Sequence, residues 1–373
     1  MKDTILFGDC KETLSAFLPQ SARTCVTSPP YYGLRDYGTA TWIGGDPNCN
    51  HRRDSKVKPE NCNTGHKNHD EMYGVGDAIY KTVCPKCGAV RQDSQIGLEE
   101  TPEEYIESLV NVFRGVRDVL TDDGTLWVNL GDSYYNYRPG KGQSYPKQSV
   151  SKTKQDLPDE CNKRGNKLEG LKEKDLIGIP WMFAFAMRKD GWYLRQDIIW
   201  HKPNPMPESV RDRCTKSHEY IFLFSKNRKY FYDNEAIKEP AKDWGTRDRT
   251  NGKYHNPGTG LAPHSGLSKS YPTKNKRSVW SVTVKPYKEA HFATYPPDLI
   301  EPCILAGSEE GDTILDPFMG AGTTAAVAKS LNRYYIGCEL NEDYGNLIQK
   351  RIQDYQPVNK VAQEPCINIL DII

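Results

Sequence analysis

The chain has 373 residues with a formal net charge of +1, and 27% of its residues are charged and 37% hydrophobic. That length allows one large domain with insertions or two domains. No apolar stretch approaches the roughly 20 residues of a membrane-spanning helix, and the amino terminus lacks a signal-peptide pattern, so we expect a cytoplasmic protein with no membrane partner. Its eleven cysteines are an odd number with a single CxxC pair, which argues against a secreted disulfide framework.

Short apolar strands alternate with amphipathic helices along the chain. Strands are predicted, in chain order, at residues 4–9, 24–28, 125–132, 192–200, 219–226, 313–316 and 334–339. Helices are predicted at 102–120, at 176–191 and from Thr323 onward. This alternation is typical of a doubly wound α/β domain with a mostly parallel sheet.

Polar segments interrupt this pattern and indicate the domain boundaries. The alternating elements assign residues 1–31, 96–237 and 291–355 to one main domain, and 32–95 to a polar insertion with its own small fold. Residues 135–175 are predicted to be a mobile basic loop, 238–290 a polar region that could order around a ligand, and 356–373 a tail. Because basic residues gather in 138–174 and 238–288, the near-neutral total charge does not exclude a nucleic-acid partner.

The segment DTILDPFMGAGTT predicts a site for a nucleotide-like cofactor. An apolar strand ends at Asp316, and Gly320 and Gly322 follow before a helix. Glycines at such a turn let backbone amides approach a ligand, and the helix N-terminus favours negative charge there. A GxG by itself is as often only a tight turn. However, Glu339 ends the next strand about 20 residues later, which is the spacing of a ribose-binding carboxylate and favours the cofactor site.

The segment TSPPY at residues 27–31, together with DPFMGAGTT and the order of the two along the chain, resembles the amino DNA methyltransferases of the β circular arrangement. The resemblance implies a catalytic domain with a permuted Rossmann-like fold, a mostly parallel seven-stranded sheet, and S-adenosylmethionine as the cofactor. It places the strands at 313–316 and 334–339 beside the strand at 4–9 in a cofactor half. The remaining strands form a target half, and 238–290 becomes the target-recognition region.

The resemblance also assigns cofactor-binding residues position by position. They are Asp316, Phe318, Gly320, Gly322 and Thr323 in the loop, Glu339 for the ribose hydroxyls, His291, Phe292 and Thr294 near the methionine part, and Asp9 near the adenine ring. Two of these have simpler alternatives, because Asp9 could cap the following helix and Phe292 could pack in the core.

The Ser28-Pro29-Pro30-Tyr31 run is predicted to be the catalytic motif. An exocyclic amine is a poor nucleophile because its lone pair is delocalised into the base, and acceptors for both amine protons favour a pyramidal nitrogen. The Ser28 side chain and the Pro29 carbonyl are suitable acceptors, and Tyr31 offers a face on which an extruded base can stack. Methyl transfer would then be direct, with positioning supplying much of the acceleration. The alternative is an ordinary turn after a strand.

Ser28 indicates the N4 amine of cytosine as the target. In the family that the chain resembles, cytosine enzymes typically carry Ser at this position and adenine enzymes more often Asp or Asn, so the N6 amine of adenine is the second hypothesis. A zinc-containing DNA-binding module without activity is the third. Methylation at C5 of cytosine is disfavoured because it needs a cysteine nucleophile, and Cys303 and Cys366 do not lie at the corresponding strand end.

The polar insertion contains a candidate zinc site. Cys84 and Cys87 form a CxxC pair, and Cys49 and His51 supply a second pair with CxH spacing. Two such pairs, separated by a few tens of residues, suit a tetrahedral structural zinc, which would explain how an insertion with few apolar residues folds. The competing ligands are Cys62, His66 and His69. A redox CxxC would need a helix beginning at Cys84, and unpaired cysteines in a turn are the simplest alternative.

Two basic and aromatic segments are candidates for DNA contact. The candidate residues are Trp200, Lys202, Asn204, Arg211, Arg213, Lys276 and Arg277. Solvated surface charges are the alternative interpretation, especially for Arg211 and Arg213. The resemblance implies double-stranded DNA as the partner, in a bacterial cell or a phage-infected host. It is compatible with a homodimer and with a cognate restriction endonuclease.

Overall fold

The computed structural model describes residues 2–33, 39–51, 80, 82–135, 168–241, 272–284 and 295–356. Most of the expected basic loop, the centre of the insertion, much of the expected target-recognition region and nearly all of the tail lie outside these ranges. The domain boundaries therefore stay predictions. Among the described residues, no helix is both long and apolar enough to cross a membrane.

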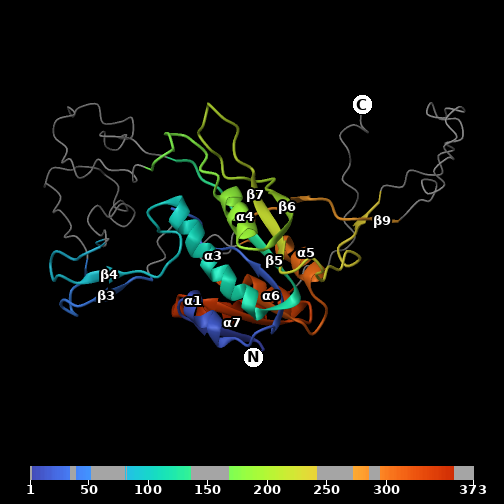
Figure 1. Ribbon diagram of the computed structural model, residues 1–373, viewed down its shortest axis with the longest axis horizontal. Coiled ribbons are helices and arrows are strands. Elements are labelled where there is room, and N and C mark those ends of the chain that lie inside the picture. The colour runs from blue at the N-terminus through green and yellow to red at the C-terminus, as the bar shows by residue number, and fades with distance from the viewer. Residues whose placement is uncertain are drawn as a thin grey trace, which may run out of the picture.

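An eight-stranded sheet forms the centre of the protein, in the order β1-β12-β11-β2-β5-β7-β6-β10 (Figure 1). In that order the strands are Thr4–Phe7, Tyr334–Glu339, Thr313–Asp316, Ala22–Thr27, Leu120–Leu130, His218–Ser225, Tyr193–His201 and Val279–Ser281. β7 is antiparallel to both of its neighbours, and every other adjacent pair is parallel. The predicted grouping is confirmed, because β12 and β11 lie beside β1, whereas β2, β5, β7 and β6 form the other half.

The predicted number of seven strands is wrong, because β10 adds an eighth at the edge of the sheet. Val279 of β10 pairs in parallel with Ile199 of β6. Trp280 is buried, and its indole N–H donates to the Arg277 carbonyl. In the sequence this short strand is surrounded by polar residues, so the local pattern does not predict that it joins the main sheet. The pairing satisfies backbone groups that β6 would otherwise present at an open edge.

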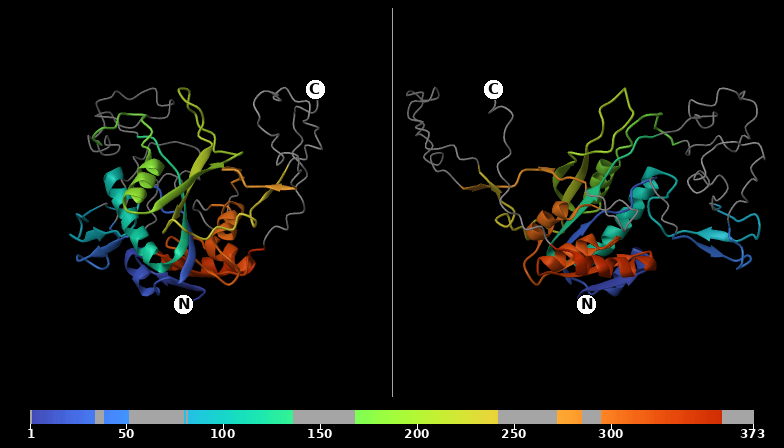
Figure 2. Two further views of the ribbon diagram at one scale, coloured as in Figure 1. Left: turned by 45° about the vertical axis from the view of Figure 1, so that its right-hand side comes forward. Right: turned by 180° about the vertical axis from the view of Figure 1, so that it is seen from behind.

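Helices cover both faces of the sheet, which explains why the strands are apolar on both sides. On β5, Leu126 and Val128 pack in one core cluster and Trp127 between them packs in the other. The first cluster joins α1 (Cys10–Thr13), α3 (Pro102–Val119) and α4 (Ile179–Lys189), and the second joins α5 (Pro297–Gly307), α6 (Thr323–Ser330) and α7 (Gly345–Asp354). Figure 2 shows the two groups on opposite sides of the strands. The predicted helices at 102–120, 176–191 and from Thr323 are confirmed.

Helix α3 connects the core to the chain that follows β2. It begins with a capping box, in which the Thr101 side chain accepts from the Glu104 N–H and the Glu104 side chain accepts from the Thr101 N–H. Its buried face includes Tyr105, whose hydroxyl donates a 2.7 Å hydrogen bond to the Pro30 carbonyl. This hydrogen bond fixes the Pro-Pro turn to the helix.

Two small antiparallel pairs lie outside the main sheet. β3 (Thr41–Ile43) pairs with β4 (Val90–Gln92), and β8 (Glu239–Pro240) pairs with β9 (Thr273–Lys274). Figure 1 shows β3 and β4 to one side of the body, beyond α3. The β3–β4 pair lies in the described part of the polar insertion.

Candidate functional site

A cleft of about 600 Å³ lies at the carboxyl ends of the parallel strands. Its walls include Gly8 after β1, Ser28 after β2, Pro317 after β11, and Glu339 at the end of β12. Carboxyl ends of parallel strands meet at one edge of a sheet, which is why segments far apart in the sequence meet here. Ser28 follows the end of β2, and the cofactor loop and the Ser-Pro-Pro-Tyr run line the same cleft.

The glycine loop and Glu339 hold each other in place. Glu339 Oε2 accepts a 2.7 Å hydrogen bond from the Gly320 N–H, and Oε1 accepts a 2.9 Å bond from the Asn341 N–H. Burial raises the pKa of the Glu339 carboxyl to about 7, although these backbone bonds oppose the shift. A carboxylate presented at the cleft wall can accept hydrogen bonds from the hydroxyls of a ribose.

Asp316 lies beneath the loop and is not part of the cleft wall. The side chain is 1% exposed. Its oxygens accept hydrogen bonds from the Thr27 hydroxyl at 2.6 Å, the Phe318 N–H at 3.0 Å, the Tyr295 hydroxyl at 3.2 Å and the Thr324 hydroxyl. Burial raises the pKa of Asp316, and these donors oppose that shift. The sequence led us to expect that Asp316 lines the cofactor loop. In the structure its carboxylate lies behind the loop, and its hydrogen bonds hold the loop in place.

The other cofactor candidates divide in a similar way. Phe318, Gly320 and Thr323 line the cleft. Gly322 does not, and its role is packing: it has a φ of +79°, and a Cβ at this position would lie 2.8 Å from Ile348 of α7. Any larger residue would therefore be strained there.

Asp9 caps the following helix, and its place near the adenine ring stays a prediction. Its side chain accepts a 2.9 Å hydrogen bond from the Lys11 N–H and caps α1, and the residue also lines the cleft. His291, Phe292 and Thr294 lie outside the described residues, so their assignment stays a prediction.

All four residues of the Ser-Pro-Pro-Tyr turn line the cleft. The Pro30 carbonyl is occupied by the Tyr105 hydroxyl, whereas no residue within the described ranges donates a hydrogen bond to the Pro29 carbonyl. The Ser28 hydroxyl lies 3.4 Å from Asn129 Oδ1. Ser28 and Pro29 both line the cleft, and the Pro29 carbonyl has no hydrogen-bond donor among the described residues.

Tyr31 is held by residues that the sequence analysis missed. Its hydroxyl donates a 2.7 Å hydrogen bond to Glu219 Oε2 and lies 3.1 Å from Asn129 Oδ1. Burial and the Glu219 carboxylate raise the pKa of the Tyr31 phenol well above its usual value. Gly131 makes room for the ring, because a Cβ there would lie 2.6 Å from Tyr31 Cε2.

Asn129 and Glu219 carried a weak signal in the sequence. Each is a polar residue next to an apolar run, in LWVNL of β5 and HEYIFLF of β7, and Asn129 is only 4% exposed. A buried polar side chain needs partners. Those partners are on neighbouring strands, and the sequence pattern does not reveal which strands are neighbours.

Of the residues expected at the target base, Lys202 and Trp200 line the cleft. Lys202 pairs with Glu219, and its ammonium lies 4.2 Å from the centroid of the Trp200 ring. Trp200 is 3% exposed and donates its indole N–H to the Val282 carbonyl at 2.8 Å. Asn204 exchanges two hydrogen bonds with the Val284 backbone, at 3.0 and 3.1 Å. Both Trp200 and Asn204 therefore brace the β6 end against the segment after β10.

The remaining basic candidates lie outside the cleft wall, and three of them pair with acidic residues. Arg213 pairs with Glu208 at 2.7 Å and stacks on Tyr134, which supports a bracing role. Lys276 and Arg277 both face Glu239, at 3.8 and 3.1 Å. Arg211 is exposed. Contact of these four residues with DNA stays a prediction.

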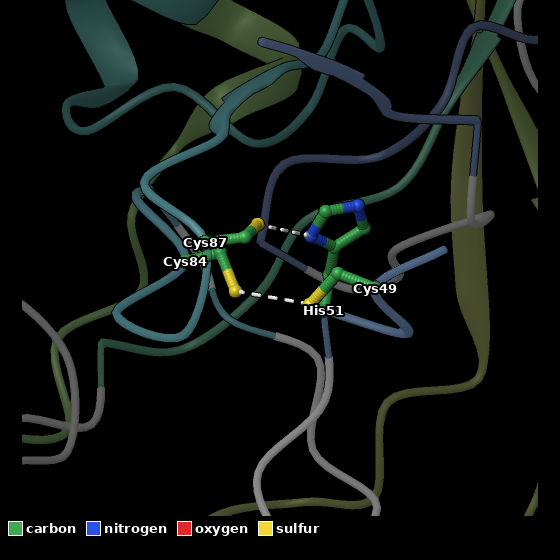
Figure 3. A group of neighbouring side chains, drawn as sticks. All are labelled: Cys49, His51, Cys84 and Cys87. Atoms are coloured by element: carbon green, nitrogen blue, oxygen red, sulfur yellow. Dashed lines mark hydrogen bonds between the residues drawn. The ribbon is translucent and has the colours of Figure 1, made fainter. Parts of the chain in front are cut away.

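The four proposed metal ligands converge in the insertion (Figure 3). Within the described residues, one donor atom each from Cys49, His51, Cys84 and Cys87 lies within 4.8 Å of the others. Cys49 Sγ is 3.8 Å from Cys84 Sγ, and Cys87 Sγ is 3.5 Å from His51 Nδ1. Tetrahedral zinc with ordinary bond lengths would separate two sulfurs by about 3.8 Å and a sulfur from a nitrogen by about 3.5 Å. The donor set therefore fits zinc.

Local structure explains how these ligands are held. The hairpin β3–β4 brings the two pairs together, and the His51 ring stacks on Trp42 of β3 with centroids 4.3 Å apart. Gly45 has a φ of +72°, and a Cβ there would lie 2.8 Å from Cys87 Sγ. The alternative ligands Cys62, His66 and His69 lie outside the described residues.

The fold and the cleft together define a class of protein. A doubly wound sheet with a glycine loop, an acidic strand end and a Ser-Pro-Pro-Tyr turn around one cleft is the architecture of an α/β methyltransferase. The solved PvuII DNA methyltransferase (cytosine-N4-specific) has the same fold, with a TM-score of 0.54 and 15% identity over 96% of this chain and 89% of that one.

Comparison of sequences identifies the family. Residues 22–350 match the N6/N4 DNA methylase family. The chain is 39% identical to the Type II methyltransferase M.XycI of Xanthomonas campestris pv. cyanopsidis, over 94% of this chain and 87% of that protein. It is also 39% identical to M.SmaI of Serratia marcescens, over 93% and 90%. The chain therefore belongs to the N6/N4 amino DNA methyltransferases and is an S-adenosylmethionine-dependent DNA methyltransferase.

Proposed function

We propose that this enzyme methylates the N4 amine of cytosine in double-stranded DNA. The observation that carries the proposal is the pair of acceptors, the Ser28 hydroxyl and the Pro29 carbonyl, in one cleft with the glycine loop. Serine at the first position of the motif favours cytosine over adenine within this family. Similarity to Type II methyltransferases over most of the chain supports a sequence-specific DNA substrate.

The cleft has the groups that S-adenosylmethionine needs. Glu339 would accept from the ribose hydroxyls, Phe318 and Asp9 would flank the adenine side, and the loop at Gly320 would lie against the methionine part. When bound, the cofactor supplies a methyl group on a positively charged sulfur. A cleft of about 600 Å³ is within the usual range for a ligand of this size.

The chain's own residues prepare the amine. A flipped cytosine would donate hydrogen bonds from its two N4–H groups to the Ser28 oxygen and the Pro29 carbonyl, which turns the nitrogen lone pair out of conjugation with the ring. Tyr31 would stack on the base, and its hydroxyl is fixed by Glu219. The nitrogen would attack the methyl carbon as the carbon–sulfur bond breaks and leaves a neutral thioether, and one amine proton would then pass to water. Positioning of the two reactants supplies much of the acceleration.

Mass spectrometry of nucleosides tests the proposal. DNA treated with the purified enzyme and cofactor should contain N4-methylcytosine. N6-methyladenine without N4-methylcytosine would overturn the choice of base and leave the methyl transfer intact.

We further propose that the Cys49, His51, Cys84 and Cys87 cluster holds one structural zinc ion. The ligand spacings support zinc, and a site with four protein ligands has no open position for catalysis. Metal binding would supply folding energy to a hairpin with a small apolar core.

A cognate restriction endonuclease in the same host is the partner that we propose beside DNA. The Type II designation of the relatives supports a restriction–modification pair. Cells that carry the endonuclease should survive only when this methyltransferase is active. The expected homodimer stays a prediction, and sedimentation of the purified protein tests it.

A further inference from the structure

Met206 is the most exposed large hydrophobic side chain among the described residues, with 86% of its surface accessible. It lies in the segment between β6 and β7, which projects from the body in all three views (Figures 1 and 2). The residue also lines the cleft that contains Ser28. An apolar side chain therefore stands in solvent on the lip of the pocket where the target base would enter.

The segment that carries Met206 is held on both sides. Pro205 and Pro207 flank it and restrict the backbone. On one side, Asn204 exchanges two hydrogen bonds with the backbone of Val284. On the other side, Glu208 pairs with Arg213 and accepts a 3.2 Å hydrogen bond from the Lys216 N–H. These contacts hold the segment in place and leave Met206 exposed.

A duplex with one base extruded has a gap that an apolar side chain can fill. Proteins that distort DNA insert such wedges, methionine among them, between base steps. Methionine suits an irregular gap because its side chain is unbranched and polarizable. Arg211 on the same segment is exposed and gives it a basic residue for a phosphate beside the gap.

We propose that Met206 inserts into the duplex and occupies the space that the flipped target base leaves. The inference rests on the proposed function, because a gap exists only if the enzyme extrudes its base. Met206 would stabilise the extruded state and would not contact the transferred methyl group. It is thus a positioning residue for the reaction.

The test compares two duplexes that carry the enzyme's own methylation site, located by sequencing modified DNA. One is fully paired, and the other has an abasic site opposite the target cytosine, which lowers the cost of extrusion. Met206→Ala should lower kcat/KM on the paired duplex by about tenfold or more, because unstacking a base step is costly. On the abasic duplex the loss should shrink to about twofold or less. Met206→Leu should keep most of the activity on both.

Leu18→Ala is the matched control, since Leu18 is 64% exposed and does not line the cleft. It should leave both duplexes unaffected, and cofactor affinity should be unchanged in all variants. An equal loss for Met206→Ala on both duplexes would show contact with the base itself and overturn the proposal, as would no loss on the paired one. If the wild-type enzyme transferred no methyl group to cytosine, the proposed function would fail instead.

Discussion

The Tyr31 hydroxyl donates a 2.7 Å hydrogen bond to Glu219 Oε2, and this contact joins the end of the catalytic motif to strand β7. The same carboxylate pairs with Lys202 and lies 3.4 Å from the Asn129 amide nitrogen. Asn129 in turn lies beside Ser28. A single half-buried carboxylate therefore organises both ends of the Ser-Pro-Pro-Tyr turn.

Glu219→Gln should slow turnover about 10- to 100-fold, because a hydrogen bond to a charged acceptor contributes about 1.5–3 kcal/mol. The cofactor dissociation constant should not change, since Glu219 does not contact the glycine loop. Single-turnover kinetics and calorimetry measure the two quantities. Tyr31→Phe combined with Glu219→Gln should cost less than the sum of the single changes, and simple additivity would contradict the coupling. Glu235→Gln, which removes an ion-paired carboxylate outside the cleft, is the control.

Ser28→Ala should lower kcat by about 100-fold or more, in the range seen when a single positioned catalytic hydrogen bond is removed. Affinity for S-adenosylmethionine should stay near the wild-type value, because the side chain faces the amine. The rate is followed by transfer of a labelled methyl group to DNA. An equal loss of cofactor binding would show that Ser28 has been assigned to the wrong ligand.

Cofactor affinity should rise with pH across the neutral range. Glu339 has a pKa raised to about 7 in the free protein, and only its ionised form accepts from both ribose hydroxyls. The dissociation constant should therefore fall as the carboxyl ionises between about pH 6 and pH 8 and then level off. Calorimetry across this range measures it. Glu339→Gln should bind more weakly and lose the pH dependence, and a variant that keeps the same profile would exclude Glu339 as its source.

Replacing Asp316 should lower the stability of the protein more than replacing Glu339 does. Asp316→Ala removes the acceptor of four hydrogen bonds and leaves buried donors unsatisfied, so the free energy of unfolding should fall by about 3 kcal/mol or more. Cofactor binding weakens as the loop loses its support. Glu339→Ala should weaken binding with a smaller loss of stability. Denaturant titration beside calorimetry separates the two, and equal stability losses would contradict the assignment.

The purified protein should contain about one zinc ion per chain. Cys84→Ser should abolish that zinc and lower the stability of the insertion, whereas Cys214→Ser, at an exposed cysteine, should retain it. Elemental analysis gives the metal content. Chelation should make the insertion sensitive to protease while the body still binds cofactor, and a metal-free protein with a protected insertion would remove the zinc proposal.

Much of this protein follows from local patterns in its sequence. The helix at 102–120, the strand at Thr313–Asp316 before the glycine loop, and the helix from Thr323 depend on neighbouring residues, so spacing alone predicts them. The proposed ligands Cys49, His51, Cys84 and Cys87 were predicted from the short fixed spacing within each pair, with Cys62, His66 and His69 left as alternatives.

Other features depend on which distant segments become neighbours. Asn129 and Glu219 reach Tyr31 only because β5 and β7 pair next to β2, and alternation along one strand does not encode the identity of the adjacent strand. Asp316 can hold the loop because the hydroxyls of Thr27 and Tyr295, which are distant in the sequence, donate hydrogen bonds to its buried carboxylate. The exposure of Met206 likewise depends on how the β6–β7 segment is braced. Tertiary contacts decide burial and partners, and these decide what each polar or apolar side chain can do.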